Sequence, residues 1–160
     1  MSTLEQEIHT IGRRAREASR SLARLTADQK NAILEAMADE ILVRTPDILD
    51  ANALDTTAAE KAGLTSASID RLRLTEKRIA DMAAGIRQVA SLNDPVGEIL
   101  RCWTRPNGIE ISKIRTPIGV IGIIYEARPN VTADAAGLCV KAGNACILRG
   151  GSEALHSNRA

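Results

Sequence analysis

Aromatic side chains are almost absent from this 160-residue chain, which has no Phe, one Trp and one Tyr. Without large rings, a hydrophobic core has to be built from Ala, Leu, Ile and Val. Long apolar runs are absent too. The longest uncharged apolar stretch, Ile118 to Tyr125, is far shorter than the roughly 20 residues that cross a bilayer. The hydrophobic fraction of 44% is ordinary for a globular protein.

An excess of charge of one sign is also lacking. The chain has 21 basic and 20 acidic residues, which give a formal net charge of +1. A protein that binds nucleic acid usually carries a clustered positive surplus. The charge balance therefore argues against nucleic-acid binding.

Cysteine is scarce, and its spacing fits neither a metal knuckle nor a disulfide framework. The three cysteines, Cys102, Cys139 and Cys146, are odd in number and include no Cys-x-x-Cys pair. We therefore expect reduced thiols, no bound metal and a cytoplasmic location. The N-terminal segment has no apolar signal-peptide stretch, and its acidic residues argue against an arginine-rich transit peptide.

Residues 1–95 have the periodicity of consecutive helices, and we expect them to form a helical N-terminal part. The first helix has one apolar stripe in steps of three and four: Leu4, Ile8, Ile11, Ala15, Ala18, Leu22 and Leu25. This stripe favours packing on its own domain over a coiled coil. Later helices are predicted from their capping residues, which are Thr26 with Gln29, Thr45, Thr65 or Ser66, and Thr75. Gly63 is expected to end the third helix.

Residues 96–116 are expected to form a β-hairpin. Glu98–Thr104 and Ile109–Arg115 are short β-prone runs on either side of Arg105-Pro106-Asn107-Gly108. An Asn-Gly pair between two such runs is a strong hairpin signal.

Residues 117–160 alternate between strand and helix patterns. Ile118–Ile124 is a continuous apolar run, typical of a strand buried on both faces of a parallel sheet. A helix should follow from Pro129 or Asn130 to Ala142, then a strand over Ala145–Arg149 and a further helix capped by Ser152. This βαβα order predicts an α/β fold with the start of a Rossmann-type sheet.

In an open parallel sheet, ligands bind beyond the carboxyl ends of the strands. Two loops occupy that place here, Tyr125–Asn130 and Arg149–Glu153. In the second loop, the Arg149 guanidinium matches a phosphate, Ser152 offers a hydroxyl at a helix start, and Glu153 could accept from ribose hydroxyls. The alternative interpretation of this loop is a plain helix cap with a surface arginine.

The first loop places a cation, Arg128, and an amide, Asn130, at the mouth of the predicted sheet. An amide at that point can stabilise a developing oxyanion. Asn130 could instead be the N-cap of the following helix. His9 and His156 have no nucleophile near them in the sequence and are assigned to surface or packing roles.

Several of these segments resemble coenzyme-binding motifs of the aldehyde dehydrogenase superfamily: Pro117–Val120, Pro129-Asn130, Ala142–Asn144 and Ile147–Arg149. Two longer strings, Ile124–Thr132 and Ile147–Glu153, are similar to those of the gamma-glutamyl phosphate reductase family within it. The resemblance covers the whole chain but less than half of a family member.

This resemblance implies NADPH-dependent reduction of L-glutamate 5-phosphate to L-glutamate 5-semialdehyde, with release of phosphate, in proline biosynthesis. It assigns Asn130 to the oxyanion and Arg128 to the substrate. Tyr125, Arg149, Ser152 and Glu153 are assigned to the NADP(H) site, and either Ser152 or Glu153 contacts the adenosine ribose. The resemblance also implies a homo-oligomer formed through the hairpin and a functional link to glutamate 5-kinase.

The family's nucleophilic cysteine lies in a second, downstream domain, and none of the three cysteines here matches it. The expectation is therefore an N-terminal fragment without reductase activity of its own. Two alternatives remain: the reductase region of a bifunctional pyrroline-5-carboxylate synthase, and a non-catalytic binding or assembly module with this fold.

Overall fold

The computed structural model describes residues 2–126 and 128–160. Helices make up the first part: α1 (Thr3–Leu22), α2 (Ala27–Val43), α3 (Thr45–Lys61), α4 (Ser66–Leu72) and α5 (Glu76–Ser91). The rest contains β1 (Ile99–Thr104), β2 (Glu110–Ile114), β3 (Val120–Ile124), α6 (Asn130–Lys141), β4 (Ala145–Arg149) and a short 3₁₀ helix, η1 (Ser152–Ala154). The predicted α/β fold class is confirmed.

Hydroxyl caps begin most of the early helices, as the sequence predicts. Thr26 and Gln29 form a complete capping box before α2, and Thr65 and Thr75 cap α4 and α5. The expectation for Thr45 is wrong, because Thr45 is the first helical residue of α3 and its hydroxyl donates to the Ile41 carbonyl of α2. α2 and α3 are joined through a single residue, so this hydroxyl satisfies the end of one helix instead of the start of the next.

The main core lies where α2, α5 and α6 pack together, and it contains no aromatic side chain. Its fully or almost fully buried members are Leu34, Ala38, Ile79, Ala83, Ile86 and Ala90. Burial of one Leu or Ile side chain contributes roughly 1.5–3 kcal/mol to the free energy of unfolding. These small aliphatic side chains therefore hold α6, and the residues at its start, in place.

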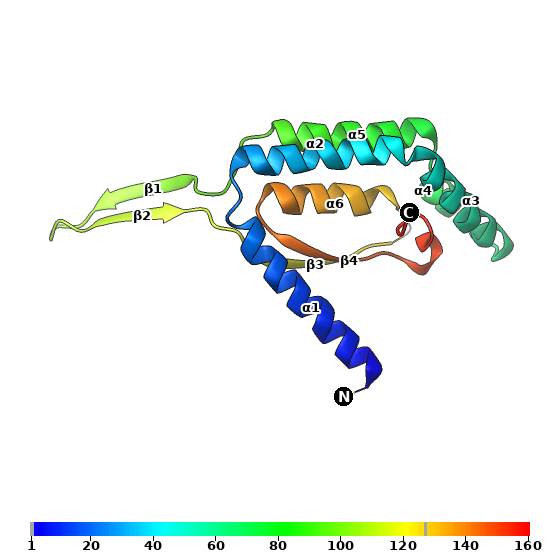
Figure 1. The fold of residues 1–160 in the computed structure, drawn as a ribbon, viewed down its shortest axis with the longest axis horizontal. Coiled ribbons are helices and arrows are strands. Elements are labelled where there is room, and N and C mark those ends of the chain that lie inside the picture. Colours follow the sequence, from blue (N-terminus) through cyan, green and yellow to red (C-terminus); the bar gives the residue numbers. More distant parts are fainter. Residues whose placement is uncertain (1, 127) are drawn as a thin grey trace.

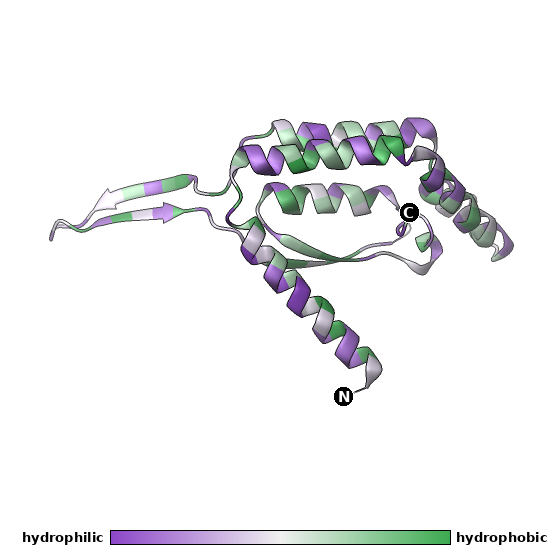
Figure 2. Cartoon of the chain, viewed as in Figure 1, coloured by the Kyte–Doolittle hydropathy of each residue, from purple (hydrophilic) through white to green (hydrophobic). Residues whose placement is uncertain are grey.

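The chain stacks in layers around a small parallel sheet (Figure 1). β3 and β4 pair in parallel from Val120 with Ala145 to Ile124 with Arg149. α6 covers one face of the sheet and α1 crosses the other, with α2 and α5 lying beyond α6. Figure 2 shows that the two strands are among the most apolar segments of the chain.

Burial of the first strand on both faces is not confirmed. Residues of β3 are half-buried or exposed, and Ile124 is 78% exposed. The reason is that, within the described residues, the sheet has only two strands, so both of its edges and part of its faces stay open.

The hairpin of β1 and β2 projects away from the layers (Figure 1). Its turn has the expected residues but another geometry from that of a two-residue Asn-Gly turn. Among the turn residues 105–108, only Gly108 has a positive φ. The Gly108 amide donates to the Arg105 carbonyl, and the Arg105 amide donates to the Ile109 carbonyl. The loop is therefore a three-residue turn with glycine in the left-handed position. Apolar residues along the ribbon, including Ile99, Trp103 and Ile114, are exposed.

The helix expected after Ser152 is also wrong, because the chain forms only the three-residue η1 and then turns. The physical cause is the buried carboxylate of Asp55 on α3. It accepts hydrogen bonds from the backbone amides of His156 (3.1 Å) and Ser157 (2.7 Å). In an α-helix those amides would donate to the carbonyls of residues 152 and 153.

Candidate functional site

The carboxyl ends of β3 and β4 lie side by side at one edge of the sheet. The ladder continues one step beyond the strands, where the Tyr125 amide donates to the Arg149 carbonyl at 3.1 Å. The loops that follow, Tyr125–Asn130 and Arg149–Glu153, are therefore neighbours, as the sequence predicts. Ala127 of the first loop lies outside the described residues.

Side-chain hydrogen bonds join the first loop to the turn that follows the second loop. The Tyr125 hydroxyl lies 2.6 Å from the Thr132 hydroxyl on α6, which donates to Asn158 Oδ1 at 2.9 Å. Gly150 is enclosed by these partners. A Cβ atom at Gly150 would collide with Asn158 Nδ2 and lie 3.2 Å from the Tyr125 ring. A side chain at position 150 would therefore require the Asn158 side chain to move, which would disturb its hydrogen bond with Thr132.

Asn130 is the first residue of α6, and the structure does not make it the helix cap. Pro129 occupies the N-cap position, with no side-chain capping bond. The Asn130 amide instead donates to Asp134 Oδ2 at 3.1 Å, which orients its side chain along the start of α6. The capping interpretation of Asn130 is thus wrong.

Asn130 and Arg128 line a polar cleft of about 410 Å³ between the start of α6 and the region of α4 and α5. Its other walls come from Asp70, Arg71, Arg73, Leu74, Arg78, Asp81, Met82 and Asp134. Arg73 and Arg78 are already paired with Glu60 and Asp70. Within the described part of the chain, Arg71 and Arg128 have no such carboxylate partner within ion-pair distance.

Arg71 was missed by the sequence analysis. It lies on α4, 57 positions before Arg128, and no local pattern distinguishes it from the other arginines of the helical half. A smaller cavity of about 110 Å³ brings Arg71 and Arg128 together with Glu126 and Glu153. The cleft that holds Asn130 is therefore close to the loop after β4.

The loop after β4 has exposed polar groups and no usable helix start. Arg149 ends β4 with its side chain exposed. Ser152 does not cap a helix: its hydroxyl donates to Glu153 Oε2 at 3.3 Å, and Gly151 occupies the N-cap position of η1. One short 3₁₀ turn has no sizeable dipole, so the phosphate-binding role expected of a helix N-terminus loses its physical basis here.

A buried polar cluster lies behind this loop and was also missed. Asp55, only 3% exposed, accepts from the Ser157 hydroxyl (2.6 Å) and pairs with His156 Nδ1 (2.7 Å), besides the two backbone amides. Burial acts to raise the pKa of Asp55, but the hydrogen bonds from Ser157 and His156 outweigh it and hold that pKa below its ordinary value. Asn52, one turn earlier on α3, binds the Ser157 hydroxyl and the Leu72 carbonyl.

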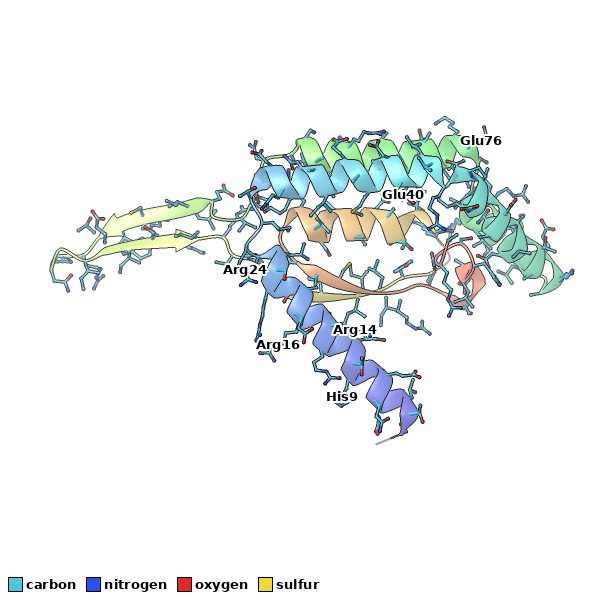
Figure 3. All side chains as sticks on the ribbon, in the orientation of Figure 1. His9, Arg14, Arg16, Arg24, Glu40 and Glu76 are labelled. Carbon is cyan, nitrogen blue, oxygen red and sulfur yellow. The ribbon has the colours of Figure 1, made fainter. Side chains whose placement is uncertain are left out.

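The cysteines and the N-terminal histidine lie away from this edge. Cys102 is exposed on the hairpin, Cys139 is buried in α6 and Cys146 is half-buried in β4, and none of the three lines the cleft. Burial raises the pKa of the Cys139 thiol. His9 projects from α1 with its arginine neighbours (Figure 3). Residues 2–126 and 128–160 hold no cluster of three potential metal ligands and no helix that could span a membrane.

A larger groove of about 560 Å³ runs between α2 and α6, with Ile41, Met82 and Ala133 among its lining residues. Its lining is mainly apolar, and its polar members, Glu40, Arg44, Thr132, Ser157 and Asn158, include no residue of the two loops. The polar edge of the sheet is therefore the better candidate site.

The layered arrangement has known counterparts. A probable aldehyde dehydrogenase from Listeria monocytogenes superposes on 96% of the chain with a TM-score of 0.62, although only 16% of the residues are identical. An acetylating aldehyde dehydrogenase from Geobacillus thermoglucosidasius gives a TM-score of 0.55 at 19% identity. The chain thus has the fold of the corresponding part of the aldehyde dehydrogenases.

Within that fold, the chain is most clearly similar to gamma-glutamyl phosphate reductases. The crystal structure of the Thermotoga maritima reductase matches 92% of the chain, with a TM-score of 0.89 and 43% identity. The Saccharomyces cerevisiae reductase matches 99% of it, with a TM-score of 0.90 and 32% identity. The reductase of Moorella thermoacetica is 60% identical over 154 residues, which make up 96% of this chain and 37% of the relative.

The chain thus spans between about a third and two fifths of the length of these reductases, and the shared part is their N-terminal part. No protein-family model matches it. The resemblance seen in the motifs is confirmed over nearly the whole chain.

Proposed function

We propose that the chain supplies the coenzyme-binding and oxyanion-binding part of an NADPH-dependent reductase. The reaction would convert L-glutamate 5-phosphate into L-glutamate 5-semialdehyde and phosphate, a step of proline biosynthesis in the cytoplasm. One observation carries the proposal: a chain 60% identical to a gamma-glutamyl phosphate reductase brings Asn130, Arg128 and the Arg149 loop to one edge of its sheet.

The proposed roles are assigned to three consecutive segments of the chain. Residues 1–95 form the helical part of the coenzyme-binding domain, 96–116 the oligomerisation hairpin, and 117–160 the start of a Rossmann-like sheet. The exposed apolar side chains of the hairpin support a role in homo-oligomer formation, because isolated two-stranded ribbons are marginally stable. A kinase that phosphorylates the glutamate side chain would have to supply the substrate.

The groups at the sheet edge fit NADPH. Arg149 offers an exposed guanidinium for a phosphate group, and Glu153 offers carboxylate oxygens that could accept from ribose hydroxyls. Ser152, whose hydroxyl is 3.3 Å from Glu153, is the other candidate for the ribose. The ring of Tyr125 forms a wall beside Gly150. When bound, the coenzyme supplies the hydride for the reduction.

The chain's own residues would act on the substrate from the neighbouring cleft. Arg128 and Arg71 would attract its anionic groups, and the Asn130 amide would donate to the oxygen that gains charge during acyl transfer. The present bond from Asn130 to Asp134 holds that amide at the start of α6, facing the cleft.

Nucleotide binding tests the proposal. The chain should bind NADPH more tightly than NADH, as measured by the change in coenzyme fluorescence on titration. Arg149→Ala should reduce this preference about tenfold, since a charge-assisted contact to one phosphate is worth roughly 1.5–3 kcal/mol. Arg105→Ala, at the exposed tip of the hairpin, is the matched control and should behave like the wild type. Failure to bind NADPH, or an unchanged preference in Arg149→Ala, would count against this coenzyme site.

A further inference from the structure

Thr132 occupies the middle of a hydrogen-bonded series that joins Tyr125, in the loop after β3, to Asn158, in the turn that follows the loop after β4. A threonine hydroxyl has one proton, and here it is donated to Asn158 Oδ1. The Tyr125 hydroxyl, 2.6 Å away, must then donate to Thr132. The order of donation is fixed: Tyr125 to Thr132 to Asn158.

The two end members of this hydrogen-bonded series, Tyr125 and Asn158, lie in or directly beyond the loops of the proposed coenzyme site. Tyr125 begins the loop after β3, and Asn158 belongs to the turn that follows the loop after β4. Between them lies Gly150, where an added Cβ would collide with the end of the Asn158 side chain and approach the Tyr125 ring. The immediate surroundings of Gly150 therefore depend on where Thr132 holds these two side chains.

The turn that contains Asn158 is also hydrogen-bonded to α3. Asp55 binds the two residues that precede Asn158 through their backbone amides, and Thr132 stands on α6, whose core packing is tight. The link thus joins α6 to a turn that is hydrogen-bonded to Asp55 on α3. Removal of the Thr132 hydroxyl would leave the partly buried Tyr125 hydroxyl and the Asn158 oxygen without this partner.

We propose that Thr132 is a positioning residue for the coenzyme, because its hydroxyl holds Tyr125 and Asn158 on either side of Gly150 in the loop after β4. Thr132 need not touch the coenzyme itself. The inference rests on the proposed function for the identity of the ligand, NADPH, but the link from Tyr125 to Asn158 is a property of the chain alone.

Thr132→Val keeps the shape of the side chain and removes only the hydroxyl. It should raise the Kd for NADPH about five- to tenfold. It should also speed the hydrogen exchange of the Ala154 and Asn158 amides, which are hydrogen-bonded to the Gly151 and Ala154 carbonyls in this turn. Thr132→Ser restores the hydroxyl and should return both measurements to near the wild-type values. Adding Tyr125→Phe to Thr132→Val should weaken binding no further, because both changes break one link.

Thr10→Val is the control for the chemical change. The Thr10 hydroxyl donates to the Gln6 carbonyl within α1, on the other face of the sheet, and its loss should alter neither measurement. An unchanged Kd in Thr132→Val, whatever its exchange rates, would overturn the positioning role. If the wild-type chain bound no NADPH while Thr132→Val still exchanged faster at Ala154 and Asn158, the proposed coenzyme would be wrong and the link from Tyr125 to Asn158 would stand.

Discussion

Replacement of Asp55 by Asn should lower the free energy of unfolding by about 3–5 kcal/mol, the usual cost of breaking a buried, hydrogen-bonded charge. The carboxylate has four partners, two amides of the chain, the Ser157 hydroxyl and the His156 ring. An asparagine keeps one acceptor oxygen and turns an NH₂ group toward the remaining donors. At least one bond to a charged group, worth roughly 1.5–3 kcal/mol, is therefore lost, and a buried backbone N–H is left facing another donor.

Urea unfolding at pH 7, followed by far-ultraviolet circular dichroism, measures this effect. With a slope of about 2 kcal/mol per molar urea, the midpoint should fall by roughly 1.5–2.5 M. Asp50→Asn is the matched control, because Asp50 is exposed on the same helix. That change should shift the free energy by less than about 0.5 kcal/mol.

The pH dependence gives a second, independent check. The pKa of Asp55 in the folded chain lies below its ordinary value of 3.8. A carboxyl group of this kind stabilises the fold above its unfolded pKa, and the contribution is lost as the pH falls through the folded pKa. The gap between wild type and Asp55→Asn should therefore be full at pH 7 and shrink below pH about 4. Equal midpoints at pH 7, or a gap that widens in acid, would refute this account of the cluster.

Two further predictions concern the substrate cleft and require a reductase assay of the protein that carries this chain. Asn130→Ala should lower kcat by roughly 10²–10³ because a donor to the oxyanion is lost. Asn130→Asp should have a similarly low kcat, since an ionised carboxylate cannot donate a hydrogen bond. A kcat within twofold of wild type in either variant would contradict the role of Asn130. Arg71→Gln should raise KM for L-glutamate 5-phosphate about tenfold with little change in kcat. Arg16→Gln, on exposed α1, is its control, and an unchanged KM in Arg71→Gln would remove Arg71 from the substrate site.

Local signals in the sequence were enough to predict most elements. Thr26, Thr65 and Thr75 cap helices because their partners lie three residues ahead, within the same turn. Gly63 and the Asn107-Gly108 pair are equally local, since the turn itself needs glycine in a left-handed conformation. The two strands at the end of the chain were visible as apolar runs between turn residues.

The sequence-based prediction was wrong where a residue distant in the sequence takes a hydrogen bond that a local helix would otherwise form. Nothing around Ser152 shows that Asp55, about a hundred residues earlier, takes the amides that a following helix would use. Nothing in the sequence indicates that Arg71 and Arg128 line the same cleft. Their proximity depends on the tertiary packing of α4 beside the start of α6, which no local pattern in either segment predicts. The two loops of the candidate site could be predicted, but the residues that hold them could not.

A heteronuclear NMR titration of the isotope-labelled chain with NADPH tests the central claim most directly. The account predicts saturable shifts of backbone amides in residues 125–130 and 149–153, with Asn130 and Arg149 in the affected set. The hairpin amides of residues 99–114 should stay unchanged. The absence of saturable shifts, or shifts centred on the hairpin while the two loops remain unaffected, would contradict the assignment of this sheet edge as a coenzyme site.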